Sequence, residues 1–181
     1  MKTFLRHIVL VGVSSMMSSV FISCDSEDVN DCLQTEGSTI QETVSLPFFN
    51  KIRLEDGVSM TIKQGEDQKV ILETGENLRN DVDIRVEDET LIARDNNGCN
   101  FFRDYNATHL TVTVPNLADI INGSSYDIRS EGLLNFPNIR LRSLVILGLD
   151  LKKNGNFYLN LNSDVVSVVA NGSSVFYLNG E

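Results

Sequence analysis

Histidine and cysteine are the side chains best suited to metal binding and nucleophilic catalysis, and this 181-residue chain has two histidines and three cysteines. His7 lies in the apolar N-terminal segment, which leaves His109 for the rest of the chain. Histidine-based zinc sites and catalytic triads need several such groups held together. We therefore interpret His109, at the start of a strand predicted for residues 110–114, as a surface or edge residue.

Acidic and amide side chains gather in three predicted turns, at residues 66–67, 87–89 and 95–98. Their oxygen atoms could bind calcium, which takes about six to eight oxygen ligands from a defined loop. None of the three segments matches the EF-hand pattern or the glycine-rich calcium repeat. We interpret them as solvated turns and expect no metal and no cofactor.

Paired carboxylates for glycoside cleavage are a further alternative, because the sequence does not give distances between strands. Enzymes of this kind on stacked strands use an extended groove with basic residues. Arg129, Arg140 and Arg142 could line one face, but basic residues are few and scattered. We expect no enzymatic activity, with a carbohydrate-active enzyme on a β-helix as the alternative.

The N-terminal segment, residues 1–23, has the three parts of a secretory signal. Lys2 and Arg6 give a positive start, an apolar stretch follows, and the small Ser23 precedes Cys24. The apolar stretch is shorter than the about 20 residues that a membrane-spanning helix needs. The segment therefore predicts export of the chain.

The ending Phe21-Ile22-Ser23-Cys24 resembles a lipobox, although Phe21 stands where leucine is usual. In a lipobox the cysteine receives acyl chains such as palmitate, and the chain is cleaved just before it. Several acyl chains on one residue anchor a protein stably to a membrane. We predict that Cys24 is lipid-modified and becomes the mature N-terminus.

Residues 24–44 are polar and are predicted to form a lipidated acidic tether that passes into a first strand. The run Asp25-Ser26-Glu27-Asp28 resembles the surface-export signal of Bacteroidetes lipoproteins. The expected location is the cell envelope, as an outer-membrane lipoprotein exposed at the surface. A periplasm-facing position is the alternative.

The charge balance limits the partners of the chain. It carries 25 acidic and 15 basic residues, a formal net charge of −10. Affinity for nucleic acid comes from Lys and Arg neutralising phosphates, so nucleic-acid binding is excluded. Cys32 and Cys99 could pair in an oxidising envelope, but their spacing fits no metal pattern. We favour two separate thiols, with a disulfide as the alternative.

From residue 45 onward, apolar residues alternate with polar ones, which is typical of half-buried strands. Val58, Met60 and Ile62 show this period, as do Leu110, Val112 and Val114. Outside the signal segment, no apolar residues recur at helical spacing over a sustained window. The sequence therefore predicts an all-β domain without substantial helix.

One short motif occurs twice, as Asn122-Gly123-Ser124 and as Asn171-Gly172-Ser173, each time after a β-branched run. Two coils between the copies would have roughly 24 residues each, a length typical of stacked-strand repeats. Small residues permit tight corners, and Asn and Gly tolerate positive φ. We predict a parallel β-helix, or β-solenoid, with these six residues at its corners. An antiparallel hairpin sheet is the alternative, since Asn-Gly is also the commonest hairpin turn.

Several segments, taken in order, resemble the head GIN domain family of auto-transporter adhesins, bacterial envelope proteins. They are Phe49-Asn50-Lys51-Ile52, residues 56–65, residues 73–78, residues 110–117 and the two Asn-Gly-Ser-Ser motifs. The resemblance covers about residues 45–181, which we expect to form a single domain. It implies a β-helix-like fold in an exported, often lipid-anchored protein, and no known catalytic reaction.

Two features depart from the family pattern. Residues 144–151 contain only Gly148 where a further corner would fall, and the chain stops directly after a strand, at Glu181. A solenoid normally carries a capping element over its last coil. We expect either that a cap is missing or that the final coil pairs with a partner.

One aromatic cluster falls in a predicted loop: Phe101, Phe102 and Tyr105. It either covers the open end of the core or forms a binding patch for a glycan or protein. The expected function is a lipid-anchored, non-enzymatic, adhesin-like display domain, bound to the membrane through its anchor and to a glycan or envelope protein through its surface. The alternative is a structural envelope module that associates with itself through residues 175–181.

Overall fold

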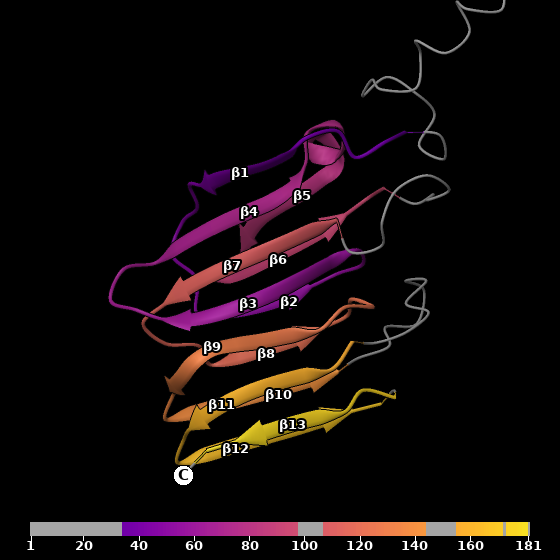
Figure 1. Ribbon diagram of the computed structural model, residues 1–181. Coiled ribbons are helices and arrows are strands. Elements are labelled where there is room, and N and C mark those ends of the chain that lie inside the picture. The colour runs from indigo at the N-terminus through magenta and orange to yellow at the C-terminus, as the bar shows by residue number, and fades with distance from the viewer. Residues whose placement is uncertain (1–33, 98–106, 144–154, 172, 181) are drawn as a thin grey trace, which may run out of the picture.

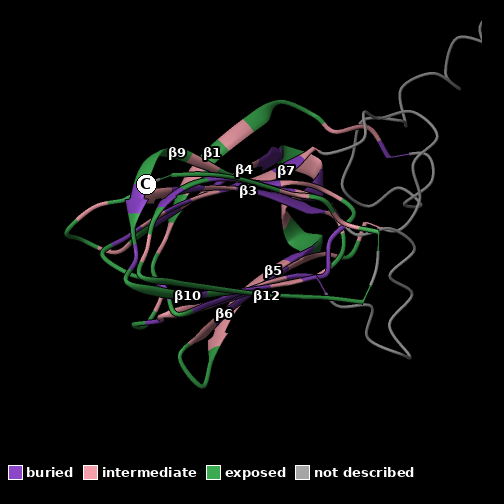
Figure 2. Cartoon of the chain, turned by 90° about the horizontal axis from the view of Figure 1, so that it is seen from below, coloured by how far each residue is buried: buried purple, intermediate pink, exposed green. Residues whose placement is uncertain are grey.

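The computed structural model describes residues 34–97, 107–143, 155–171 and 173–180. Within these ranges the chain forms thirteen β-strands and one short 3-10 helix. The strands make two sheets that lie face to face (Figures 1 and 2). The predicted all-β fold is confirmed, and none of the described helical residues form a segment long and apolar enough to cross a membrane.

The strands in chain order are β1 (Thr39–Val44), β2 (Lys51–Leu54), β3 (Val58–Gln64), β4 (Lys69–Gly75), β5 (Val82–Glu87), β6 (Thr90–Asp95), β7 (Thr108–Val114), β8 (Asp119–Asn122), β9 (Ile128–Asn135), β10 (Asn138–Ser143), β11 (Phe157–Asn162), β12 (Val165–Ala170) and β13 (Phe176–Asn179). The 3-10 helix η1 (Glu76–Asp81) connects β4 to β5.

The seven-stranded sheet has the order β1-β4-β7-β3-β9-β11-β13, and the six-stranded sheet has the order β12-β10-β8-β2-β6-β5. Pairing is antiparallel for β1–β4, β4–β7 and β5–β6. All the other neighbouring strands pair in parallel. Both sheets are therefore mixed, with their antiparallel pairs at the same end (Figure 1).

The strands do not stack in chain order. From β8 to β13 the chain alternates between the sheets, and each strand from β10 onward pairs in parallel with the strand two places earlier. The pair β2 and β3, however, lies between β6 and β7 on one side and β8 and β9 on the other. This order is that of two mixed sheets and does not by itself establish the regular parallel β-helix that the sequence predicts.

The core lies between the two sheets, and buried residues alternate with less buried ones along strands such as β7 (Figure 2). Leu110, Val112 and Val114 of β7 are fully buried, as the period-two pattern predicts. Ile52 and Ile120 contribute the same kind of buried side chain from the six-stranded sheet. Each such strand therefore contributes its inward residues to one continuous core and leaves its outward residues polar.

The segment expected to be the tether contains the first described strand. Residues 39–44 form β1, which pairs with β4 from Thr39 opposite Gly75 to Val44 opposite Val70. Gln34 is also buried, and its Nε2 donates a hydrogen bond to the carbonyl oxygen of Asn77 at 2.8 Å. The transition from tether to first strand thus occurs before residue 45.

Candidate functional site

The first Asn-Gly motif forms a side-chain-supported turn after β8. Asn122 is buried, and its Oδ1 accepts a hydrogen bond from the backbone N–H of Ser124 at 3.0 Å. Its Nδ2 donates to the carbonyl oxygen of Tyr126 at 3.0 Å. The Ser124 hydroxyl in turn accepts from the backbone N–H of Tyr126 at 3.2 Å. Two short polar side chains therefore satisfy the backbone of this turn.

Asn122, Gly123 and Asn171 do not use the positive φ that Asn and Gly tolerate. The side chain of Asn122 forms the turn, so a left-handed backbone is not needed. Positive φ occurs instead at Asp88 and Glu89, at 49° and 59°, where a two-residue turn closes the β5–β6 hairpin.

The two copies of the motif are also not equivalent in register. Asn122 pairs with Ser143, and Ser143 pairs with Ala170, so Asn171 falls one residue later. Asn171 is exposed, whereas Asn122 is buried. Ser173 is exposed, and Gly172 lies outside the described residues. The sequence repeat thus marks two turns at the same side of the stack that use different contacts.

Other residues singled out from the sequence lie outside the described ranges. They are Cys24, the remaining cysteines Cys32 and Cys99, and the aromatic cluster Phe101, Phe102 and Tyr105. The structure therefore leaves the lipidation site, the disulfide alternative and that aromatic patch as predictions.

His109 has a partner that the sequence did not reveal. It lies on β7 opposite Ser59 on β3, and the Ser59 Oγ is 2.8 Å from the His109 Nδ1. Ser59 is only 6% exposed, and its Oγ also lies 3.3 Å from the carbonyl oxygen of Thr108. His109 is therefore part of a polar contact on the outer face of the seven-stranded sheet.

Burial lowers the pKa of His109 below its ordinary value of 6.5, and the nearby carboxylate of Glu73 opposes this shift. The ring is therefore neutral at pH 7 and can either accept or donate at Nδ1.

A hydrogen-bonded serine and histidine also resemble a catalytic nucleophile and its base, and such a pair needs a third group that orients the histidine ring. Glu73 lies opposite His109 on β4, but its carboxylate accepts a hydrogen bond from Gln41.

The lowered pKa predicts a pH-dependent stability. The unfolded chain takes up a proton at His109 near its ordinary pKa of 6.5, while the folded chain takes it up only at lower pH. Since the unfolded state then binds more protons, the free energy of unfolding should decrease as the pH is lowered from about 7.5 to about 5.5. Urea unfolding of the wild type and His109→Gln at both pH values measures this. Equal pH dependence in the two proteins would contradict the assignment.

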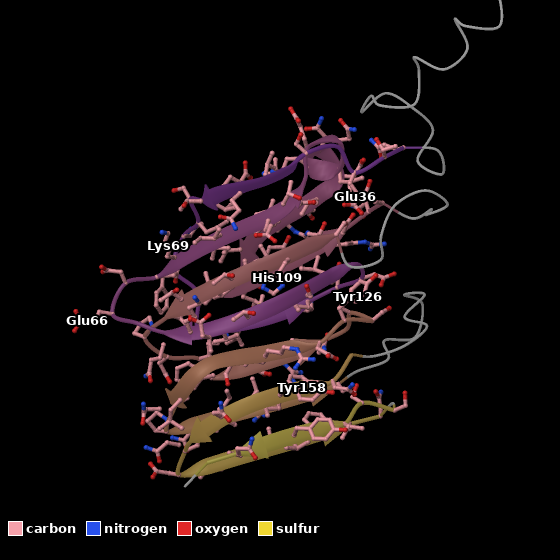
Figure 3. The ribbon with its side chains drawn as sticks, in the orientation of Figure 1. Glu36, Glu66, Lys69, His109, Tyr126 and Tyr158 are labelled. Atoms are coloured by element: carbon pink, nitrogen blue, oxygen red, sulfur yellow. The ribbon has the colours of Figure 1, made fainter. Side chains whose placement is uncertain are left out.

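A shallow hollow surrounds the Ser59–His109 pair, with a volume of about 360 Å³. It lies on the outer face of the seven-stranded sheet, where Figure 3 shows His109, Tyr126 and Tyr158 on the same side. Most of its lining groups can form hydrogen bonds. The hollow is lined by Ser59, Met60, His109, Ser125, Tyr126, Asp127 and Arg129.

The hollow continues into a stack of planar groups, the outer ladder, formed by Arg129, Tyr158 and Tyr177. These residues are paired in register across β9, β11 and β13. The Arg129 guanidinium lies 4.0 Å from the centroid of the Tyr158 ring, and the Tyr158 and Tyr177 rings stack at 4.6 Å with an interplanar angle of 8°. Parallel in-register strands place identical positions about 4.8 Å apart, which is the spacing that ring stacking needs.

Charges in the hollow offset one another. Arg129 donates from Nη2 to the Asp127 carboxylate at 2.7 Å, and the His109 ring is neutral at pH 7. Donors and acceptors are therefore present without a net charge. This combination suits a neutral, polar ligand better than a phosphate or another strong anion.

The three arginines that could have lined one face do not share a face. Arg129 lies on the seven-stranded sheet, whereas Arg140 and Arg142 lie on β10 of the six-stranded sheet. Arg142 is also paired, donating to both carboxylate oxygens of Asp119 at 2.9 and 2.6 Å. The three residues therefore do not form one basic face, because β9 and β10 belong to opposite sheets.

The described residues contain no cluster of three or more His, Cys, Asp or Glu side chains that could hold a metal ion. Two facing sheets make this an all-β domain, with a polar hollow on one outer face. The family model described as "Putative auto-transporter adhesin, head GIN domain" matches residues 48–181, and the chain belongs to this family. The resemblance noted in the sequence is confirmed.

Several solved structures have the same fold. A "putative adhesin" from Bacteroides fragilis NCTC 9343 is 18% identical, with a TM-score of 0.65 over 78% of this chain and 63% of that one. A "putative adhesin" from Parabacteroides merdae ATCC 43184 is 12% identical, with a TM-score of 0.57 over 80% and 59%. A "putative lipid binding protein" from Parabacteroides distasonis ATCC 8503 is 12% identical, with a TM-score of 0.52 over 80% and 61%.

The chain spans about three fifths of the length of these three structures. At such low identity the similarity establishes the fold alone. No curated protein matches the chain. The family nevertheless supports an adhesin-like protein of the cell surface or envelope.

Proposed function

We propose that this protein is a lipid-anchored, surface-exposed outer-membrane protein whose non-enzymatic domain binds a neutral glycan. The observation that carries the proposal is the hollow at Ser59 and His109 together with the outer ladder beside it. Membership of the adhesin-like family supports a binding role. The proposed glycan site lies on the rigid outer face of the seven-stranded sheet.

Glycan recognition needs two kinds of contact that this surface offers together. Hydroxyl groups of a sugar both donate and accept hydrogen bonds, and the surface offers the Ser59 hydroxyl, the Asp127 carboxylate as an acceptor and the Arg129 guanidinium as a donor. The C–H face of a sugar packs against an aromatic ring, and Tyr177 is 50% exposed. A neutral ligand also avoids repulsion by a chain with a formal net charge of −10.

The strand arrangement supports a solenoid-like display module. Strands β8 to β13 alternate between the sheets and stack in parallel, so each added pair extends the same face. The lipobox-like Cys24 supplies the anchor, and the acidic residues after it favour export to the surface. An anchored domain of this kind presents its lateral face to the surroundings of the cell.

The proposal assigns a structural and binding role to the Ser59–His109 pair. Ser59 is the second residue of β3, opposite His109 on β7, and its hydroxyl is held between the His109 ring and the Thr108 carbonyl. If the pair were catalytic, Ser59→Ala would abolish hydrolysis of a bound glycan or ester. We expect no turnover by the wild type, so that the variant changes binding alone.

The proposal is tested by binding of soluble residues 25–181 to a glycan array, followed by affinity measurements on the best ligand. Tyr158→Ala removes the middle ring of the outer ladder and should weaken binding by up to about tenfold, since a stacked aromatic contact contributes about 0.5–1.5 kcal/mol. Tyr158→Phe keeps the ring and should retain most of the affinity.

Phe48→Ala is the matched control, because Phe48 is 61% exposed and lies before β2, away from the hollow-lining residues. It should bind like the wild type. Equal loss in Phe48→Ala and Tyr158→Ala would contradict a site at the outer ladder. If the domain retained an envelope protein and no glycan, the ligand would be a protein and the glycan proposal would be wrong.

A further inference from the structure

We propose that the outer face of the six-stranded sheet carries a second ligand site, which binds the carboxylate of an acidic sugar through Lys51 and Arg140. This site, the basic hollow, lies where β2, β8, β10 and β12 begin and has a volume of about 330 Å³. It shares no lining residue with the hollow at Ser59 and His109, which lies on the opposite outer face. Binding here therefore does not depend on the neutral-glycan site.

The strand register places three charged residues in one row on this face. Arg140 of β10, Asp119 of β8 and Lys51 of β2 are partners across three adjacent parallel strands. Each precedes a buried apolar residue of its own strand, so their side chains point to the outer face. β2, β8 and β10 all have strand neighbours on both sides, which fixes the row. The two cations flank β8, with Cα atoms about 10 Å apart, and their long side chains can reach one carboxylate between them.

The carboxylate in the middle of this row is already neutralised. Arg142, two residues after Arg140 on β10, donates from Nε and Nη2 to the two oxygens of Asp119 at 2.9 and 2.6 Å. A bidentate pair of this kind fixes both partners. The side chain of Asp119 is 13% exposed. An anion above β8 would therefore meet a neutralised ion pair and not a free negative charge.

Lys51 and Arg140 differ from the other cations of this face, because neither has a hydrogen-bonded or acidic side-chain partner among the described residues. The other basic side chains of the face contact carboxylates: Arg142 contacts Asp119, Arg53 and Arg94 contact Glu55, and Arg85 contacts Asp83 and Glu87. The Lys51 ammonium and the Arg140 guanidinium thus keep their donors available for a ligand.

The two available cations give the basic hollow a net positive charge within a chain whose formal net charge is −10. Such a local excess attracts an anion over a short range, since salt screens exposed charges beyond about 10 Å. The surrounding acidic surface would repel a densely charged polymer such as nucleic acid. The ligand should therefore carry isolated carboxylates separated by neutral groups.

The remaining lining of the basic hollow suits a sugar ring. Asn138 and Ser167 supply an amide and a hydroxyl, which can donate to and accept from ring hydroxyl groups. Ala118, Ile139 and Val165 supply apolar surface for the C–H face of the ring. An isolated oxyanion would use the two cations alone. The combination of cations, neutral polar groups and apolar surface points to an acidic sugar.

The test measures binding of the full chain, in a non-ionic detergent, to a labelled tetrasaccharide of alternating glucuronic acid and N-acetylglucosamine, by fluorescence anisotropy. The matched ligand is the same tetrasaccharide with its carboxylates reduced to hydroxymethyl groups, and it should bind at least about tenfold more weakly. Arg140 is exposed, so Arg140→Gln should fold normally. This variant should raise the Kd for the acidic tetrasaccharide at least about tenfold, because it removes a charged hydrogen-bond donor, and Lys51→Gln should act in the same direction.

Arg85→Gln is the matched control, since it removes the same charge from the same outer face but on β5, at the far edge of the sheet. It should bind the acidic tetrasaccharide like the wild type. Equal binding of the two tetrasaccharides, or equal loss in Arg85→Gln and Arg140→Gln, would overturn the site. Binding of a tetraglutamate peptide without binding of the acidic tetrasaccharide would overturn the ligand class.

Tyr158→Ala separates this test from that of the proposed function. It removes a ring on the opposite outer face and should leave the affinity for the acidic tetrasaccharide unchanged. Arg140→Gln should in turn leave neutral-glycan binding unchanged. If Tyr158→Ala weakened binding of the acidic tetrasaccharide as much as Arg140→Gln does, a separate site on the six-stranded sheet would be excluded.

Discussion

Phe157→Ala is expected to lower the free energy of unfolding by about 3–5 kcal/mol, as is typical for a buried phenylalanine. Phe157 is fully buried on β11, and its neighbours in register are Ile128 on β9 and Phe176 on β13. The variant would leave a cavity between two stacked layers and remove the ring contact with Phe176. Because β13 is an edge strand, loss of that contact should also loosen the β12–β13 end.

Urea unfolding of residues 25–181 measures this effect, with Phe157→Leu as the control that keeps most of the apolar volume. The leucine variant should cost less than about 1.5 kcal/mol. Glycan binding should survive in folded Phe157→Leu protein, because the ring faces the core. A cost below about 1 kcal/mol for the alanine variant would show that the inner stack does not stabilise the fold as described.

Cys24→Ser is expected to move the protein almost completely from the membrane fraction to the soluble fraction. Stable anchoring needs more than one acyl chain, at about 0.8 kcal/mol per buried CH₂ group, and the proposed lipidated cysteine is the site of that attachment. Fractionation of a lipoprotein-exporting bacterium that expresses the full chain measures the change. The membrane-bound share should fall at least about tenfold.

Cys32→Ser is the control for the loss of a thiol as such, and it should remain with the membrane. Mass spectrometry of the mature protein should find an acylated N-terminal cysteine in the wild type. If Cys24→Ser stayed in the membrane fraction, the anchor would have to lie elsewhere. An unmodified N-terminus in the wild type would contradict lipidation directly.

The strands could be predicted from the sequence, because each depends on a local pattern. Alternation of apolar and polar residues identified β3 and β7, whose inward residues are buried as expected. The strand order could not be predicted in the same way. The position of β2 and β3 between pairs that come later in the chain depends on contacts between distant residues, which leave no periodic signal.

Most of the candidate site could not be predicted from the sequence either, because its residues are distant from one another in the chain. Ser59 and His109 meet because β3 and β7 are parallel neighbours, although fifty positions separate them in the chain. Arg129, Tyr158 and Tyr177 likewise come from three strands and form a stack only once the register is known. A local signal existed at Asn122, where a short amide side chain followed by Gly and Ser indicated a turn, but it did not give the φ values.

The central claim, a neutral-glycan site on the outer face of the seven-stranded sheet, is tested most directly by NMR titration of residues 25–181 with the best array ligand. The backbone and side-chain resonances of His109, Arg129 and Tyr158 should shift together and saturate at one dissociation constant. Thr43 and the hairpin residues Asp88 and Glu89, which do not line the hollow, should not move. Shifts confined to residues outside the hollow and the outer ladder, or no saturable shift with any array glycan, would contradict the claim.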